Sequence, residues 1–347
     1  MNEPCPAPTE LLKDIHGEDA KVFTSSHHAR YFEDDMAYHI VSRTIGGMAL
    51  LVPSEEVNRM VAGVLGHVQQ TYPQIQLFAY AFLSNHFHFA LRGHGIPRFV
   101  GLLKQELSRR LRHVIDVPYD ALWSGRYAAT ALPLEEDQLR AFEYILAHGV
   151  KEGLVETPEE WPGVHCARSV FQGEPCSGEW LNSTAYGRAK LLESRRPPEK
   201  QREIKKSEYA ERVEVALTRL PAFDGLDEQS LQRELKTIRA RIIEEGRAAR
   251  GSRPALGVKG VLSLPRTTRF EMPLPPWFEH RNKKRVVWSD LSAPETQAYL
   301  DRYHTSQRGF SEASRRYRAG ERDVMFPAGM YLPPVAPSSY RSLKTAA

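Results

Sequence analysis

The order of the expected elements predicts an α+β fold in which helices flank an antiparallel sheet. Between residues 37 and 149 the pattern runs strand, helix, strand, strand, helix, strand, helix. The two middle strands are joined by a turn of two residues, which suits antiparallel neighbours and not parallel ones. Residues 176–347 are expected to form a mainly helical, basic region. With 347 residues the chain exceeds the usual size of one domain, so we expect two.

The first strand and the first helix are the clearest elements. Residues 37–42 are rich in aromatic and β-branched side chains, which favours a strand. A helix is expected from Pro53, because two glutamates occupy its first turn and an apolar stripe then follows at helical spacing. The stripe consists of Val57, Val61, Val64, Leu65 and Val68. Pro73 ends this helix.

Two strands and a second helix come next. The strands 76–83 and 86–91 surround a tight turn at Ser84 and Asn85. The helix, over about residues 97–114, has an apolar inner side. Its outer side is basic and carries Lys104, Arg109, Arg110 and Arg112.

The last two elements of the predicted sheet layer lie between residues 122 and 149. Residues 122–127 form a turn into a short strand that ends near Leu132. A third helix then begins at Glu135 and stops at Gly149.

Outside this core the sequence predicts three further regions. Residues 1–24 are expected to form an N-terminal tail, residues 25–175 a first domain, and residues 176–347 an extension. Helices are expected within the extension at 207–220, 227–245 and 294–318, with a proline-rich connection at 272–278. Basic clusters at 200–206 and 281–285 suit a phosphate backbone, although each also fits an ordinary solvated surface.

Composition limits the classes of protein to consider. The net charge is only +4, and no run of about 18 apolar residues predicts a membrane span. The first residues lack the basic and apolar segments of a secretory signal, so a cytoplasmic location is expected. The three cysteines are odd in number and form no close pair, which disfavours a disulfide framework or a thiolate zinc site.

The most informative motif is a pair of histidines, His86 and His88, at the start of the strand 86–91. Side chains alternate across a strand, so both histidines project from one face and the intervening Phe87 from the other. Such a pair could hold a cation. Taken alone, it also fits two ordinary histidines of a half-exposed strand.

A second pair, Tyr144 and His148, lies on the third predicted helix. Residues four apart share one face of a helix, about 6 Å apart. If that helix packs on the strand of His86 and His88, three imidazoles would form a metal site beside a phenol. Such a site could hold Mg²⁺, Mn²⁺ or Zn²⁺, and a cation there would polarise a phosphate for attack by the tyrosine. The alternative for Tyr144 is a core aromatic with its hydroxyl at the surface.

These residues resemble a known family, the single-tyrosine HUH transposases, and most closely the branch associated with repetitive extragenic palindromes (REP). The histidine motif 85–88 is similar to the family's histidine–hydrophobe–histidine signature, and 144–155 to its nucleophile helix. Supporting similarities lie at 38–43, 122–127 and 161–168, so the resemblance covers about residues 25 to 175. It implies that residues 25–175 form a catalytic domain with the HUH, ferredoxin-like nuclease fold. The basic extension 176–347 would then bind DNA or brace the structure.

The resemblance also implies an activity. The protein would cut single-stranded DNA near a hairpin or palindrome and transfer the strand, through a 5′-phosphotyrosine on Tyr144. His86, His88 and His148 would hold a divalent metal, Mg²⁺ or Mn²⁺. Candidate phosphate contacts are Arg43, Lys104, Arg109, Arg110, Arg126 and Lys151. A homodimer is a candidate assembly.

Two departures from the family pattern concern the third ligand. Where the family has asparagine or glutamine this chain has His148, and Gly149 replaces the following proline. Histidine is a competent ligand, so we expect the site to persist with an altered metal preference. Three alternatives stay open: Tyr127 as the nucleophile, a domesticated protein that binds DNA hairpins without cutting, and a metal-dependent hydrolase in which water attacks.

Overall fold

The computed structural model describes residues 29–117, 121–269, 286–288 and 292–330. Contacts divide the chain into two compact units, one spanning residues 35–271 and the other formed by the two ends of the chain. The predicted tail 1–24, the proline-rich connection 272–278 and the basic run 281–285 lie outside the described residues. The boundary predicted at residue 175 stays a prediction.

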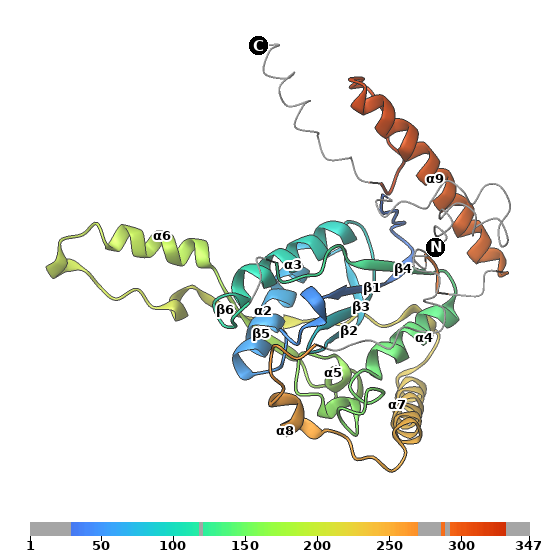
Figure 1. Cartoon of the computed structure of the whole chain (residues 1–347), viewed down its shortest axis with the longest axis horizontal. Coiled ribbons are helices and arrows are strands. Elements are labelled where there is room, and N and C mark those ends of the chain that lie inside the picture. The colour runs from blue at the N-terminus through green and yellow to red at the C-terminus, as the bar shows by residue number, and fades with distance from the viewer. Residues whose placement is uncertain (1–28, 118–120, 270–285, 289–291, 331–347) are drawn as a thin grey trace, which may run out of the picture. The chain divides into compact units, whose positions relative to one another are not determined.

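The centre of the larger unit is a four-stranded antiparallel sheet, as predicted (Figure 1). Its spatial order is β2–β3–β1–β4. The strands are β1 (Ala37–Arg43), β2 (Gln76–Phe82), β3 (His86–Arg92) and β4 (Ala128–Leu132). Central β1 and β3 pair along their whole length, with Arg43 opposite His86 and Val41 opposite His88.

Helices cover both faces of this sheet. On one face α2 (Glu55–Thr71) and α3 (Ile96–Leu111) pack together, and Phe99 of α3 meets Phe89 of β3 with ring centroids 6.2 Å apart. On the other face α4 (Glu135–Leu146) contacts β2, β3 and β4. Ser54 caps α2 by accepting a hydrogen bond from the backbone N–H of Val57, which agrees with the helix start predicted near Pro53.

A second, two-stranded sheet is the main difference from the prediction. Strands β5 (Cys176–Leu181) and β6 (Ala210–Val215) form an antiparallel pair, so the helix expected at 207–220 was wrong. Val213 and Val215 are buried while their neighbours are exposed. This alternation is typical of a strand with one buried face, and β6 contacts α2. Pairing with a distant strand therefore overrode the local pattern. Along the chain, helix α6 (Ser183–Glu193) follows β5 and precedes β6.

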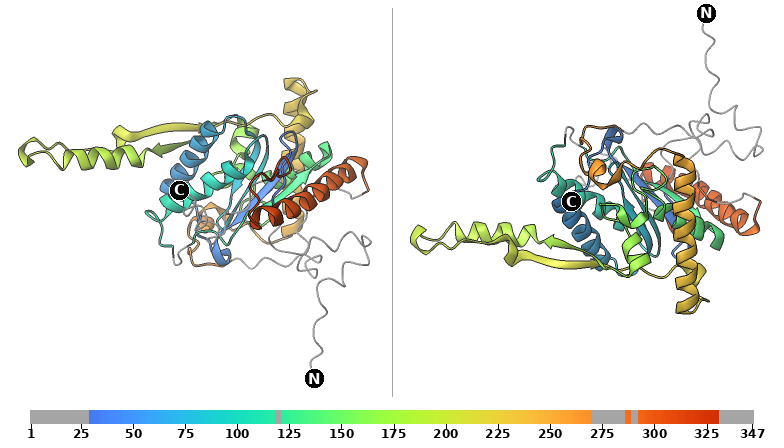
Figure 2. Two further views of the ribbon diagram at one scale, coloured as in Figure 1. Left: turned by 90° about the horizontal axis from the view of Figure 1, so that it is seen from above. Right: turned by 90° about the horizontal axis from the view of Figure 1, so that it is seen from below.

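The larger unit is completed by α5 (Ala167–Gln172), α7 (Glu228–Arg250) and α8 (Gly257–Leu262). Helix α7 matches the prediction for 227–245, and its buried side chains lie along one stripe: Leu235, Ile238 and Ile242. It contacts both α4 and α5, as the views in Figure 2 also show.

The smaller unit is built around α9 (Pro294–Arg318), whose bounds are those predicted. Tyr31 contacts the rings of Tyr299 and Tyr303 at 6.0 and 6.2 Å. Glu33 forms an ion pair with Arg302 at 2.8 Å. Residues 29–34 thus belong to the same unit as the C-terminal helix. Among the described residues, no helix combines the length and the apolar character that crossing a bilayer requires.

Candidate metal centre

Strand β3 presents His86 and His88 on the face of the sheet that α4 covers. Their rings contact each other at 4.7 Å between centroids. The intervening Phe87 points to the opposite face, where its ring meets Trp123 at 5.3 Å. The alternation predicted from the sequence is therefore observed.

The chain after α4 brings His148 to the same place. The sequence predicts His148 on the helix, but α4 ends at Leu146 and His148 lies in the following turn. Gly149 has a φ of +90°, a conformation that proline cannot adopt and that other residues rarely do. The turn places the imidazole of His148 against β3. Its ring centroid lies 4.1 Å from that of His88 and 5.5 Å from that of His86.

The three histidines form a cluster suited to a metal ion. One ligand nitrogen from each of His86, His88 and His148 lies within 4.8 Å of the other two. In each ring, Nδ1 already has a partner outside the cluster. The partners are Oδ1 of Asn85 at 2.5 Å, Nε2 of His39 at 2.9 Å and Oε1 of Glu152 at 2.9 Å, in that order. This pattern makes Nε2 the atom of each ring that a ligand would take, although Nε2 of His148 contacts Nζ of Lys151 at 3.3 Å, which a metal would displace.

Two details support this orientation. Nε2 of His88 is buried and has no hydrogen-bond partner among the described residues, which is costly unless a ligand takes it. Asn85 is itself held in place, because the backbone N–H of Thr44 donates to its carbonyl at 2.9 Å. The partner of Nδ1 of His86 is therefore fixed through its own backbone.

Electrostatics favours neutral imidazoles at the cluster. Burial, and then the charge of His148, lower the pKa values of His86 and His88 well below 6.5. Burial also lowers the pKa of His148, although Glu152 opposes the change. Burial alone would raise the pKa of Glu152, but its bonds and charge contacts with His148 and Lys151 lower it to about 2. Neutral imidazole is the form that binds metals.

The donor set limits the choice of ion. Three imidazole nitrogens suit Mn²⁺ and Zn²⁺ better than Mg²⁺, which prefers oxygen ligands and keeps its water. The residues present therefore fit a divalent metal, with nitrogen-tolerant ions first.

Tyr144 borders the cluster and remains accessible. Its ring contacts those of His148, His88 and His39 at 4.9, 5.8 and 5.9 Å. The residue is 39% exposed, so it is open to solvent at the edge of the cluster. Burial, and then the charge of Glu152, raise the pKa of Tyr144, while Arg43 lowers it. The rival Tyr127 is only 7% exposed and lies in the segment that leads into β4.

Two of the six predicted phosphate contacts lie at this cluster. Nζ of Lys151 is 3.3 Å from Nε2 of His148 and 3.1 Å from the ring centroid of Tyr144. Burial lowers the pKa of Lys151 to about 8. Arg43 ends β1 opposite His86, close enough to Tyr144 for their charges to interact.

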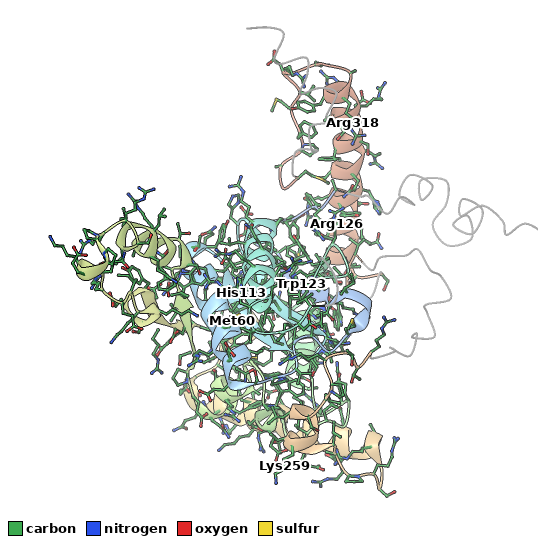
Figure 3. The ribbon with its side chains drawn as sticks, turned by 60° about the vertical axis from the view of Figure 1, so that its left-hand side comes forward. Met60, His113, Trp123, Arg126, Lys259 and Arg318 are labelled. Carbon is green, nitrogen blue, oxygen red and sulfur yellow. The ribbon has the colours of Figure 1, made fainter. Side chains whose placement is uncertain are left out.

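The other four predicted contacts lie elsewhere. Lys104, Arg109 and Arg110 belong to α3, on the opposite face of the sheet from the histidines. Lys104 donates to the carbonyl of Gly125 at 2.6 Å. Arg126 is exposed in the loop before β4, where Figure 3 labels it with Trp123.

Arg110 is engaged in contacts within the protein and is not directed at solvent. It is buried, pairs with Glu106 at 3.0 Å and donates to the carbonyl of Leu181 at 2.9 Å. Its guanidinium also lies 3.7 Å from the ring centroid of Trp180. These contacts join α3 to β5.

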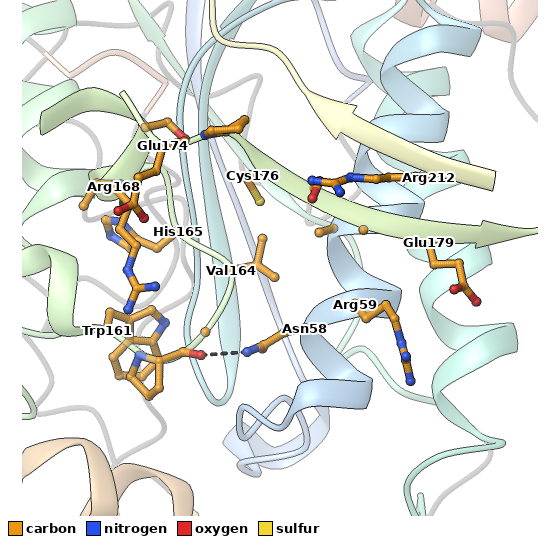
Figure 4. Close-up of a pocket in the computed structure, with 18 of the residues that line it drawn as sticks. Asn58, Arg59, Trp161, Val164, His165, Arg168, Glu174, Cys176, Glu179 and Arg212 are labelled. Carbon is orange, nitrogen blue, oxygen red and sulfur yellow. Dashed lines mark hydrogen bonds between the residues drawn. The ribbon is translucent and has the colours of Figure 1, made fainter. Parts of the chain in front are cut away.

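A separate cavity of about 640 Å³ lies between α2, α5 and the β5–β6 pair (Figure 4). Its lining includes Arg59, Trp161, His165 and Arg168, and Asn58 donates to the carbonyl of Pro162 at its edge. None of the three clustered histidines lines it. The metal-binding chemistry therefore does not belong to this cavity.

Sequence reasoning missed two residues of the site, His39 and Glu152. His39 lies on β1 beside β3, and only the strand pairing reveals that it meets His88. Glu152 had a local signal, since it follows His148 by four residues and can reach back to its imidazole. Each holds the Nδ1 atom of one candidate ligand.

Two solved structures are similar to part of this chain. One is a REP-associated tyrosine transposase bound to a REP hairpin, with 17% identity and a TM-score of 0.35 over 42% of this chain and 84% of that one. The other is a protein of Deinococcus radiodurans provisionally assigned as a transposase, with 22% identity and a TM-score of 0.26 over 34% and 95% of the chains. No protein-family model and no curated protein matches the sequence.

Proposed function

We propose that this protein is a metal-dependent endonuclease and strand transferase of the transposase kind, acting on single-stranded DNA near a hairpin. The observation that carries the proposal is the arrangement of the three histidines beside Tyr144. Each Nδ1 atom has a partner outside the cluster, so a metal would take the Nε2 atoms and displace Lys151 from that of His148. Tyr144, which is 39% exposed, lies next to them. A protein that only binds DNA has no physical need for this arrangement.

The proposed reaction is a transesterification at one backbone phosphate. The oxygen of Tyr144 bonds to phosphorus, and the bond from phosphorus to the 3′ oxygen breaks. The phenol proton is lost and the departing 3′ oxygen gains one, which gives a 5′-phosphotyrosine and a free 3′-hydroxyl. Attack by another 3′-hydroxyl reverses the step and joins two strands. No nucleotide is consumed.

Residues of the chain divide the work. His86, His88 and His148 would hold the metal, which when bound polarises the phosphate oxygen. Because the pKa of Tyr144 is raised, its proton must be removed during attack, and Arg43 stabilises the resulting phenolate. Arg43 and Lys151 would bind the oxygens of the attacked phosphate, while Lys104, Arg109 and Arg126 would meet phosphates further along the DNA.

A covalent adduct provides the test. The full-length protein is incubated with Mn²⁺, Mg²⁺ or Zn²⁺ and a labelled pool of single strands, each carrying a hairpin and a randomised flank. A denaturing gel should show a protein–DNA adduct that requires metal. Tyr144→Phe should abolish it, and the matched Tyr127→Phe should retain it. Sequencing the captured strands would identify the cut site.

The remaining outcomes distinguish the alternatives. Nicked DNA without an adduct would indicate hydrolysis by water. Binding without nick or adduct would indicate a hairpin-binding protein that no longer cuts. An adduct that persists in Tyr144→Phe and disappears in Tyr127→Phe would reassign the nucleophile.

A further inference from the structure

The segment between β5 and β6, residues 182–209, forms an arm that extends away from the sheet (Figures 1 and 2). Helix α6 makes one side of this arm and the returning chain makes the other. The arm contains eight basic and four acidic side chains, so its net charge of +4 equals that of the whole 347-residue chain. The net positive charge is therefore concentrated in one projection.

The basic side chains of the arm face solvent. All eight are exposed: Arg188, Lys190, Arg195, Arg196, Lys200, Arg202, Lys205 and Lys206. Among the acidic residues, Glu193 is buried and bonds within the arm. Burial of an acidic residue beneath exposed basic ones strengthens the positive surface.

Contacts inside the arm give it a defined shape. The side chain of Asn182 caps α6, accepting from the N–H of Ala185 at 2.9 Å. The carboxylate of Glu193 accepts the backbone N–H of Arg202 on the returning chain, also at 2.9 Å. Tyr186 and Tyr209 join the two sides near the base, with ring centroids 5.8 Å apart. The charges are thus carried on an ordered element.

The base of the arm is fixed to the main sheet unit. Trp180 of β5 lies between the ring of His67 at 3.6 Å and the guanidinium of Arg110 at 3.7 Å. Gly63 of α2 and Gly178 of β5 allow the two backbones to touch, because a Cβ added at either one would lie 2.1 Å from the other element. An anchored arm positions its charges relative to the domain.

From this geometry we propose that the arm is a second DNA contact, which grips the phosphate backbone of duplex DNA away from the cut strand. The base of the arm is attached to α2 through β5, whereas the histidine cluster lies on the face of the four-stranded sheet that α4 covers. It therefore contributes affinity and not chemistry. The proposal extends the proposed function but can be tested without it.

Charge and shape favour duplex DNA over the other partners of such a surface. Exposed basic side chains without a common apolar face suit a phosphate backbone. Leu191 and Leu192 are exposed on α6, but its apolar side chains do not gather on one side as they do in helices that lie on membranes. A contact between two copies of the arm would bring like charges together.

The test compares two full-length variants that each lose four charges. The arm variant combines Arg188→Gln, Arg195→Gln, Lys200→Gln and Lys206→Gln, whose side chains make no ion pair or hydrogen bond with the described residues. The matched control combines Arg98→Gln, Lys236→Gln, Arg247→Gln and Lys259→Gln, which are exposed outside the arm. Circular dichroism verifies folding of both.

Binding to a blunt duplex of about three helical turns is measured by fluorescence anisotropy from about 50 to 200 mM salt. The arm variant should lose at least about 10-fold in affinity, and its salt slope should fall by up to about 3.6, at about 0.9 per lost phosphate contact. The control should stay within about 3-fold of the unmodified protein.

Three results would overturn the proposal. They are unchanged duplex binding by the arm variant, an equal loss in the control, or a change of oligomeric state in light scattering that accounts for the loss. Formation of the tyrosine adduct on a short unpaired strand is measured in parallel. The arm variant should retain it, and Tyr144→Phe should retain duplex binding, so that failure of either proposal is seen separately.

Discussion

Nε2 of His39 lies 2.9 Å from Nδ1 of His88, and the planes of these two buried rings differ by only 8°. If Nε2 of His88 binds a metal, its Nδ1 carries the proton and donates to His39. Burial, and then the charge of His148, lower the pKa of His39 to about 3, which keeps it neutral and able to accept. His39 is thus a positioning residue for a candidate ligand.

Replacing His39 should weaken metal binding without unfolding the protein. His39→Phe fills the space but offers no acceptor, and we expect the affinity for Mn²⁺ to fall about 10- to 100-fold in calorimetry. His39→Gln, which keeps an acceptor, is the matched variant and should lose less. Equal affinities in both variants and the unmodified protein would show that His39 does not orient His88.

Removing the ammonium of Lys151 should have the opposite effect. Its Nζ lies 3.3 Å from Nε2 of His148, where it repels an incoming cation. Lys151→Met should raise the affinity for Mn²⁺ by about 10-fold, because the ammonium no longer repels the ion.

The same Lys151→Met variant should form the tyrosine adduct more slowly, because a contact to the phosphate is lost. Lys104→Met, on the other face of the sheet, should leave Mn²⁺ affinity unchanged. A lower Mn²⁺ affinity in Lys151→Met would indicate that the lysine supports the site rather than competing for it.

Local sequence patterns predicted the sheet because its strands and helices each carry one clear period. The histidine pair on β3 and the helix with Tyr144 followed from the same rule. The β5–β6 pair was missed, since Val213 and Val215 gain their burial only through a strand some 30 residues earlier and through α2. His39 was missed for a similar reason: strand register, and not local sequence, brings it to His88.

Acid should destabilise the protein through His165. Its Nδ1 accepts the N–H of Ala167 at 2.9 Å, and Nε2 lies 3.2 Å from the carbonyl of Ile145, so the ring is bound in its neutral form. Burial, followed by the charge of His148, lowers its pKa to about 3. The unfolded chain binds this proton near the ordinary value of 6.5, so stability is complete above that pH and lost as the pH falls toward 3.

The measurement for His165 is the free energy of unfolding in urea between those two pH values. The unmodified protein should lose about 1.4 kcal/mol per pH unit more than His165→Gln, which lacks the titrating ring. Both proteins retain His39, so their difference isolates His165. Parallel profiles would mean that His165 is not buried neutral.

Variants of Arg110 can show whether this residue stabilises the fold or binds DNA. Its guanidinium joins Glu106, the carbonyl of Leu181 and the ring of Trp180, and thereby fixes the base of the arm. Arg110→Met keeps the length of the side chain but leaves Glu106 with Arg109 as its remaining partner. We expect a loss of about 2 to 3 kcal/mol in the free energy of unfolding, less than for a buried carboxylate left with no partner.

Adding Glu106→Gln should recover part of that loss, because the buried charge is then removed as well. Duplex binding, measured under conditions where the Arg110→Met variant is folded, should keep the salt slope of the unmodified protein. A phosphate contact would give the reverse pattern, with unchanged stability and a slope reduced by about 0.9. Since the side chain is buried on α3 and already holds two hydrogen bonds, the structural outcome is the one expected.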